Sequence, residues 1–212
     1  MAESVREIAG PAGPLEALID QPAGDPRAAV VFAHPLPTEG GSMHSKVVFQ
    51  GAKALARIGC TVLRFNSRGV GRSAGAWDNG RGELDDFRAA LDFMAGRHPD
   101  LEMWTAGFSF GSHTATTIGA EDGRVGALVA IAPPVHKYEF APLKASAKPK
   151  FIIHGERDEL ISIRLVRQFY AALPEPKELI EIDRANHLFE GQTGEVGDAL
   201  EGLLEDFSCR TQ

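Results

Sequence analysis

Short apolar runs alternate along this chain with segments in which apolar residues recur every three or four positions. Such runs are typical of strands that are buried on both faces, and the wider spacing is typical of helices that pack on a sheet. A repeated strand–helix–strand order predicts parallel strands with helices on both faces of one sheet. We therefore expect an α/β fold built on a mostly parallel sheet of about seven to eight strands.

Turn residues and changes of period set the expected boundaries. The strands are expected at Leu15–Asp20, Ala28–Ala33, Cys60–Phe65, Met103–Phe108, Val125–Ala132, Lys150–His154 and Glu178–Ile182, with Val5–Ala9 paired to the first across Gly10–Pro14. The helices are expected at His44–Ile58, Gly82–His98, Phe110–Gly119, Ile163–Leu173 and Val196–Phe207. No repeat, low-complexity tract or linker divides the sequence, so residues 1–212 are expected to form a single domain.

A G-x-S-x-G pattern lies where such sheets bind ligands, outside the carboxyl end of a strand. Gly107-Phe108-Ser109-Phe110-Gly111 follows one expected strand and precedes one expected helix, which is the context that the pattern requires. Glycines let the two backbones approach each other, and a strained turn exposes the serine Oγ. The pattern predicts that Ser109 is a nucleophile. The alternative is a glycine-rich turn in which Ser109 only caps the helix.

A serine hydroxyl needs a neighbouring base, and in this arrangement the acid and the histidine follow the serine in the chain. Asp158 comes just after the strand at Lys150–His154, with Glu156 and Glu159 as competing acids. His187 follows the last expected strand and is the only histidine after position 154. We expect His187 to act as the general base and Asp158 to orient it.

Two backbone N–H groups are expected to bind the oxyanion that forms when a serine attacks a carbonyl group. The first belongs to Phe110, the residue after the nucleophile. The second should come from the loop after Ala28–Ala33, in which Pro35 and Pro37 have no N–H to donate. Leu36, between these two prolines, is therefore assigned as the second donor.

Five segments of the chain occur in combination: His34-Pro35 with Gly40–Met43, Phe65–Ser73, Gly107–Gly111, His154–Asp158 and Asn186-His187. Together they resemble a family of small bacterial α/β-hydrolases that are carboxylesterase-like and more distantly related to dienelactone hydrolases and serine aminopeptidases. The resemblance covers nearly the whole chain and implies an α/β-hydrolase fold with a Ser109–Asp158–His187 triad. Members often carry a second histidine where this chain has Leu36, but a backbone donor needs only its N–H.

The connection between Pro134 and Lys150 is about 15 residues long, which is too short for the helical lid that larger relatives insert. We therefore expect a site with a minimal lid or none, open to small or exposed acyl groups. The candidates for the wall and partial cover of an apolar pocket are Phe108, Trp77, His136, Tyr138 and Phe140, together with Leu36 and Phe110.

Other polar residues near the strand ends are explained by structural roles and need no role in binding a substrate. Arg68 is interpreted as a turn residue paired with Asp85 or Asp86 rather than as a substrate ligand, and His154 is expected to support the turn before Asp158. No histidine pair has the i, i+4 spacing of a zinc-binding helix, and Cys60 and Cys209 lack metal-ligand spacing. We expect no catalytic metal and no cofactor.

Composition excludes several classes of protein. A net charge of −7 without a basic run argues against a nucleic-acid partner, and no apolar run is long enough to span a membrane. The first residues lack the basic and apolar regions of a signal peptide, so we expect a cytoplasmic protein in a reducing compartment. It is expected to act on a small molecule, as a monomer or a homodimer.

A serine triad predicts hydrolysis through an acyl-enzyme, and we expect a carboxylesterase acting on small or short-chain esters. The same side chains could cleave thioesters, amides or peptides, so thioesterase, amidase and peptidase activities remain open. A haloalkane dehalogenase would need an aspartate at the position of Ser109. A non-catalytic binding protein with this fold would be recognised by loss of a triad residue, and all three are present.

Overall fold

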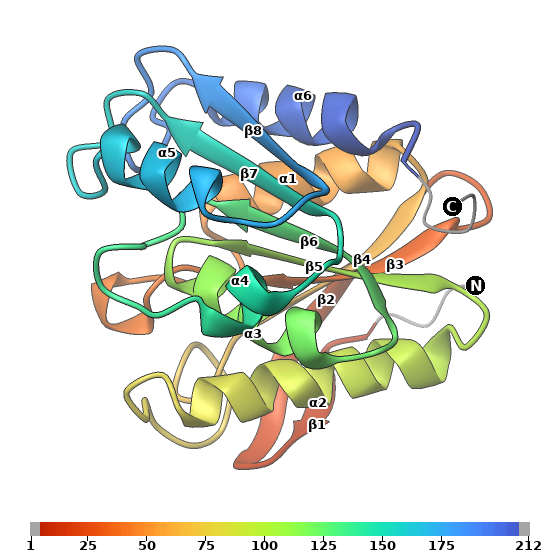
Figure 1. Ribbon diagram of the computed structural model, residues 1–212. Helices are drawn as coiled ribbons and strands as arrows, with labels where there is room; N and C mark the ends of the chain where they lie inside the picture. The colour runs from red at the N-terminus through yellow and green to blue at the C-terminus, as the bar shows by residue number, and fades with distance from the viewer. Residues whose placement is uncertain (1–4, 208–212) are drawn as a thin grey trace.

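One eight-stranded sheet runs through the computed structural model, which describes residues 5–207 (Figure 1). The strands are β1 (Glu7–Gly10), β2 (Gly13–Asp20), β3 (Ala28–Ala33), β4 (Cys60–Phe65), β5 (Glu102–Phe108), β6 (Val125–Ile131), β7 (Lys150–Gly155) and β8 (Lys177–Ile182). Their order in the sheet is β1-β2-β4-β3-β5-β6-β7-β8. The pairs β1–β2 and β2–β4 are antiparallel, and every later pair in this order is parallel.

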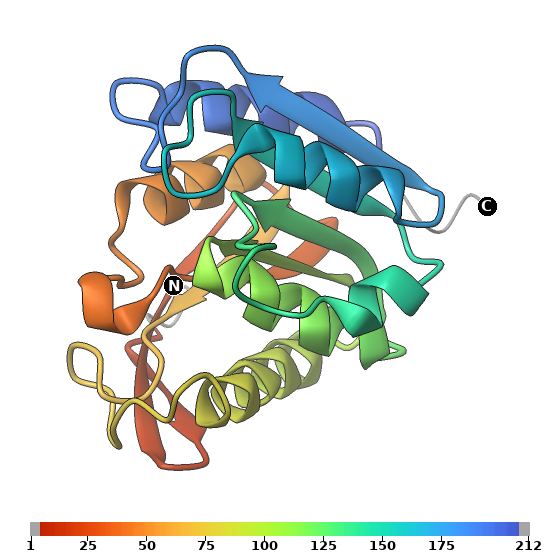
Figure 2. The same cartoon turned by 60° about the vertical axis from the view of Figure 1, so that its left-hand side comes forward.

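Helices cover both faces of this sheet, with α1 and α6 on one face and α2 and α3 on the other (Figure 2). The helices are α1 (Lys46–Arg57), α2 (Gly82–Arg97), α3 (Phe110–Glu121), α4 (Ala141–Ala145), α5 (Ile163–Ala171) and α6 (Thr193–Leu204), and η1 (Pro37–Glu39) is a 3-10 turn. The mostly parallel α/β architecture predicted from the alternation of apolar runs and helical periods is confirmed.

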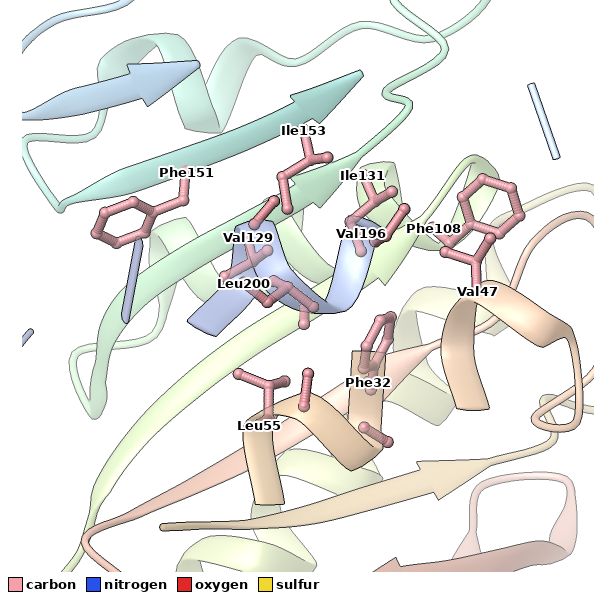
Figure 3. Close-up of a cluster of buried hydrophobic side chains, with 14 of the residues drawn as sticks. Phe32, Val47, Leu55, Phe108, Val129, Ile131, Phe151, Ile153, Val196 and Leu200 are labelled. Carbon is pink, nitrogen blue, oxygen red and sulfur yellow. The ribbon is translucent and has the colours of Figure 1, made fainter. Parts of the chain in front are cut away.

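The two faces of the sheet carry separate hydrophobic cores. All six side chains of β3 are buried, because successive side chains point to opposite faces and both faces are covered. Phe32 packs in one core with Leu55 of α1 and Leu200 of α6 (Figure 3). Val31 belongs to the other core, which α2 to α5 cover. A strand buried in this way has no polar side, which explains the continuous apolar run in its sequence.

The predicted strands and helices are all present, with boundaries shifted by at most three residues. Two short elements were not predicted, η1 and the five-residue α4. An element of about one turn contains too few residues to show an apolar period, so its sequence cannot be distinguished from a loop.

The thiol of Cys60 is buried at the start of β4. Burial raises its pKa to about 11, so this cysteine is an unreactive core residue, as expected. The sequence analysis also used Cys209, in the argument about metal ligands, and the first residues, in the argument about a signal peptide. Cys209 and residues 1–4 lie outside the described residues. Between residues 5 and 207, no helix combines the length and the apolar character needed to cross a membrane.

Four loops meet at the carboxyl edge of the parallel strands. They follow β3, β5, β7 and β8 and carry His34, Ser109, Asp158 and His187, respectively. The arrowheads of β6, β7 and β8 in Figure 1 all point to this side of the molecule. Because parallel strands end at a common edge, residues far apart in the sequence are brought together there.

Candidate active site

Ser109 lies at a sharp turn between β5 and α3, with a φ of 52° and a ψ of −121°. A positive φ is uncommon for a residue that carries a Cβ and persists only where the surroundings enforce it. A Cβ on Gly107 would lie 2.0 Å from the Gly111 carbonyl oxygen, and one on Gly111 would lie 2.5 Å from that of Ala33. The glycines of the G-x-S-x-G pattern therefore permit the close approach of strand and helix that the turn requires.

The imidazole of His187 connects Ser109 to Asp158. Its Nε2 lies 3.0 Å from Ser109 Oγ, and its Nδ1 lies 2.7 Å from Asp158 Oδ2. A carboxylate can only accept a hydrogen bond, so the Nδ1 position carries the proton and Nε2 can take the proton of the serine. The ring of Phe108 packs beside the imidazole, with 5.5 Å between ring centres. This arrangement allows a serine to lose its proton as it attacks a substrate.

Asp158 is held through both of its carboxylate oxygens. Oδ1 accepts hydrogen bonds from the N–H groups of Leu160 at 2.9 Å and Ile161 at 2.7 Å, while Oδ2 faces His187. Burial alone would raise the pKa of Asp158, but the hydrogen bond and charge of His187 and the Ile161 N–H outweigh it and hold the pKa below its ordinary value. The carboxyl group therefore stays ionised beside the imidazole.

The two acids that competed with Asp158 in the sequence make other contacts. Glu156 accepts the backbone N–H of Arg184 at 3.2 Å. Glu159 accepts the backbone N–H of His187 at 3.3 Å, so it contacts the main chain of that residue and not its ring. This second contact ties the loop of Asp158 to the loop of His187, a role that the sequence did not indicate.

His154 is fully buried below the loop that carries Asp158. Its Nε2 lies 2.8 Å from the Ile161 carbonyl oxygen and 3.6 Å from Asp158 Oδ2. Burial lowers the pKa of His154, which favours its neutral form. The expected hydrogen-bonding role of His154 in this turn is confirmed, with the Ile161 carbonyl as its partner.

Beside Ser109, the backbone N–H groups of Leu36 and Phe110 have no acceptor among residues 5–207. Phe110 is the first residue of α3, where N–H groups have no partner within the helix. The Leu36 carbonyl accepts the N–H groups of Glu39 at 3.1 Å and Gly41 at 3.0 Å. The N–H groups of Leu36 and Phe110 themselves donate to none of the described residues, and both residues line the same cavity as Ser109. They are therefore available to an oxygen atom of a ligand.

A cavity of about 560 Å³ opens beside Ser109 and His187. Of the residues predicted to form its wall or cover, five lie on it: Leu36, Phe108, Phe110, His136 and Tyr138. The ring of Tyr138 packs against that of Phe110, with 5.6 Å between their centres. The cavity therefore has an aromatic wall on the side of the β6–β7 connection.

Phe140 and Trp77 do not lie on this cavity, in contrast to the sequence-based expectation. Phe140 is 2% exposed and packs in the core against Phe169, with 5.2 Å between ring centres. Trp77 packs edge-on against Phe110 at 5.3 Å and lines a neighbouring cavity of about 380 Å³. The direction of each side chain is set by packing partners from distant parts of the sequence, which the local pattern does not contain.

Two exposed leucines flank the mouth of the cavity. Leu160 is 62% exposed and Leu188 is 52% exposed, and both line the cavity that contains Ser109. The connection from β6 to β7 contains only the short α4, so it forms no helical lid over this mouth. The sequence did not single out these leucines, although each lies within two residues of an expected triad member.

Arg68 takes no part in the cavity beside Ser109. Its guanidinium binds both oxygens of Asp86, at 3.0 and 2.8 Å, and its backbone N–H donates to the same carboxylate at 2.8 Å. Asp85 pairs instead with Arg88 at 2.7 Å. The interpretation of Arg68 as a turn residue is confirmed, and Asp86 is its partner. Among the described residues, no group of three or more His, Cys, Asp and Glu side chains could hold a metal ion.

The model of the serine aminopeptidase S33 family matches residues 24–147. An uncharacterized protein of Rickettsia prowazekii is 36% identical over 205 residues, which cover 92% of this chain and 86% of that protein.

Two solved structures are similar over nearly their whole length. An α/β serine hydrolase homologue from Coxiella burnetii has a TM-score of 0.90 and 36% identity, covering 96% of this chain and 98% of that one. XC6422 from Xanthomonas campestris, described as an α/β serine hydrolase without a lid, has a TM-score of 0.89 and 35% identity, covering 95% and 94%. The fold of this chain is thus the α/β-hydrolase fold, in agreement with the resemblance found in its sequence.

Proposed function

The chain belongs to the serine aminopeptidase S33 family of α/β serine hydrolases, and on that premise we propose that it is a carboxylesterase acting on small or short-chain esters. Ser109 is the nucleophile, His187 the general base and Asp158 the residue that orients it. The observation that carries this proposal is the 3.0 Å contact between His187 Nε2 and Ser109 Oγ at the wall of a cavity with two free N–H donors. We also propose that the chain is a single domain, and the mechanism proposed below uses no metal or cofactor.

Acylation begins when Ser109 Oγ attacks the ester carbonyl carbon and its proton passes to His187 Nε2. The carbonyl oxygen becomes an oxyanion that accepts hydrogen bonds from the Leu36 and Phe110 N–H groups. When the tetrahedral intermediate collapses, the bond from carbon to the alcohol oxygen breaks, and His187 gives its proton to the departing alcohol. The acyl group remains on Ser109.

Deacylation repeats these steps with water. His187 Nε2 takes a proton from the water molecule, and the resulting hydroxide attacks the acyl carbon. The bond to Ser109 Oγ then breaks, and the proton returns from His187 to the serine oxygen. In both half-reactions Asp158 stabilises the protonated imidazole, which matches the lowered pKa of its carboxyl group.

The side chains around Ser109 favour binding of a substrate with an uncharged, apolar acyl group. Aromatic side chains and Pro134 line one wall of the cavity, and Leu160 and Leu188 extend this apolar surface to its mouth. Covering exposed leucines with an apolar part of a ligand removes their surface from water, which makes the free energy of binding more favourable. The absence of a helical lid in the β6–β7 connection favours substrates that can enter directly from solvent.

One observation favours a second activity, cleavage of a peptide or amide that carries a free amino group. Two acidic residues, Glu39 and Glu159, line the cavity together with one basic residue, Lys137. A carboxylate near the scissile bond would attract an ammonium group, as an aminopeptidase substrate requires. The triad chemistry is the same for both activities, so the substrate decides between them.

A substrate panel tests the proposal. Wild-type protein and a Ser109→Ala variant are assayed with p-nitrophenyl esters of increasing acyl length, the matching thioesters, and aminoacyl p-nitroanilides. We expect hydrolysis of the short esters by the wild type alone. Equal rates for the two proteins would disprove a role for Ser109, whereas a Ser109-dependent preference for the anilides would assign the peptidase activity. Labelling of Ser109 by a fluorophosphonate reports whether the nucleophile is activated, whatever the substrate.

A further inference from the structure

His34 is a buried histidine that the mechanism above does not use. It follows β3 directly and is 3% exposed, and it lies at the carboxyl edge where the loops of the site meet. Its ring touches the backbone of two loops. Nε2 is 3.1 Å from the backbone nitrogen of Ser67, in the loop after β4, and Nδ1 is 2.7 Å from the carbonyl oxygen of Pro35.

These two contacts determine which ring nitrogen of His34 carries the proton. A backbone N–H can only donate, so Nε2 accepts the hydrogen bond from Ser67. A carbonyl oxygen can only accept, so Nδ1 carries the proton and donates it to Pro35. Burial lowers the pKa of His34 to about 4, and the ring is therefore neutral, as this pattern requires.

The Pro35 carbonyl belongs to the same peptide unit as the Leu36 N–H. This peptide bond is trans, and a trans peptide is planar with its C=O and N–H pointing in opposite directions. A group that fixes the direction of the Pro35 carbonyl therefore also fixes the direction of the Leu36 N–H. Leu36 lines the cavity that contains Ser109, and its N–H donates to no described residue.

Gly41 also packs closely against the Pro35–Leu36 peptide. A Cβ on Gly41 would lie 2.1 Å from the Pro35 carbonyl oxygen, so only glycine allows the observed approach. The Gly41 N–H also donates to the Leu36 carbonyl at 3.0 Å, which fixes the following peptide unit. The Pro35–Leu36 peptide is thus held by the His34 ring, by Gly41 and by the flanking prolines.

We propose that His34 is a positioning residue for the oxyanion hole: its Nδ1–H holds the Pro35 carbonyl so that the Leu36 N–H faces the oxygen of the reacting carbonyl group. This inference rests on the proposed serine hydrolase mechanism. An oxyanion donor acts only when it is aimed before the reaction begins, because reorienting it in the transition state would consume part of the stabilisation. The His34 ring bonds to Pro35 and Ser67 and does not line the cavity that contains Ser109, so it acts through the Pro35–Leu36 peptide.

Three substitutions at position 34 separate this role from a general structural one. His34→Asn can place an amide N–H near the former Nδ1 position and keep the bond to Pro35. His34→Gln places its amide near the former Nε2 position. His34→Ala removes all of the ring contacts, including the one between Nε2 and Ser67 Oγ at 3.0 Å. The exposed His44 provides the matched control, His44→Ala. Each variant is checked for folding by circular dichroism and thermal unfolding.

We expect His34→Ala and His34→Gln to lower kcat for a short p-nitrophenyl ester by roughly 10- to 100-fold, with KM within about threefold of wild type. His34→Asn should recover most of kcat, and His44→Ala should equal wild type. A folded His34→Ala protein with wild-type kcat would overturn the proposal. So would equal losses in the Asn and Gln variants, since that result would indicate packing and not the bond to Pro35.

Gly41→Ala tests the same peptide without altering His34. Its Cβ must displace the Pro35 carbonyl, so kcat should fall with little change in KM, and the double variant with His34→Ala should lose no more than the worse single variant. Wild-type kcat in folded Gly41→Ala, or additive losses in the double variant, would contradict the inference. The Gly41→Ala single variant tests the proposal even if the His34 variants do not fold.

The rate of Ser109 labelling by a fluorophosphonate is measured in parallel for all variants, because it depends on the oxyanion hole but not on an ester substrate. If wild type is labelled but cleaves no ester, the proposed substrate is wrong and the labelling rates still test His34. If wild type is not labelled, the nucleophile assignment itself fails, and the His34 inference fails with it.

Discussion

The Nε2 atom of His187 lies 3.0 Å from the Oγ atom of Ser109, although the two residues are 78 positions apart in the sequence. They meet because β5 and β8 are parallel strands of one sheet, so that the loops after them leave from the same edge. A third loop from that edge, after β7, brings Asp158 to the other side of the imidazole at 2.7 Å. The imidazole is thus held between the serine and the carboxylate by residues of three different loops.

Asp158→Asn should lower kcat by about 10⁴-fold, because an asparagine amide in this place favours the tautomer of His187 that cannot accept the serine proton. Steady-state kinetics with a short p-nitrophenyl ester measures the effect. The control is Glu156→Gln, two residues away, whose side chain contacts the Arg184 backbone and not the imidazole. A larger loss in the Glu156 variant than in the Asp158 variant would show that the acid has been assigned to the wrong residue.

The protein should lose stability as the pH falls from about 6.5 toward 4, and His34 should account for part of this loss. The pKa of His34 is about 4 in the folded chain, against an ordinary value of 6.5. The unfolded chain therefore takes up a proton first, so the stabilisation is complete above pH 6.5 and is lost toward pH 4. The shift corresponds to about 3 kcal/mol.

Urea unfolding of wild type and His34→Asn at pH 7.5 and at pH 4.5 measures this contribution. The stability of His34→Asn should depend less on pH than that of wild type. Burial lowers the pKa of His154 as well, so a pH dependence in the same direction should remain in the variant. An unchanged pH dependence in His34→Asn would contradict the lowered pKa of His34.

Leu160→Ser and Leu188→Ser should alter the preference for acyl length without affecting the triad. Both side chains are more than half exposed, so their loss should change the free energy of unfolding little. For a hexanoyl ester we expect kcat/KM to fall roughly tenfold, while the acetyl ester is hydrolysed as by wild type. Phe49→Ser is the control, since Phe49 is 40% exposed and does not line this cavity. An equal loss for both esters would show that the leucines support the loops and do not contact the substrate.

Asp86→Ala should destabilise the fold by about 3 kcal/mol, because it leaves the Arg68 guanidinium largely buried without its partner. Thermal or urea unfolding measures the change. Asp85→Ala, the adjacent position, removes a 60% exposed carboxylate and should be close to neutral. The folded fraction of Asp86→Ala should keep the kcat of wild type if Arg68 serves the turn and not the substrate. A selective loss of kcat would instead place Arg68 at the site.

Much of the fold followed from local signals in the sequence. The apolar run at Ala28–Ala33 identified β3 because burial on both faces leaves no room for polar side chains. The G-x-S-x-G pattern located the turn at Ser109, and the chain order of strands pointed to Asp158 and His187, which the structure brings together. These positions could be predicted because each depends on period, backbone sterics or strand order, all of which can be read along the chain.

Period, chain order and residue type were enough to predict the α/β sheet and the edge at which the polar residues gather. Packing in three dimensions selected Asp86 and not Asp85 as the partner of Arg68, and it directed Phe140 into the core against Phe169. It also set the hydrogen bond from the His34 ring to the Pro35 carbonyl oxygen. Each of these outcomes depends on which atoms of a distant segment occupy the neighbouring space. A side chain takes the direction in which it finds a partner, and for these residues that partner lies on another strand or helix.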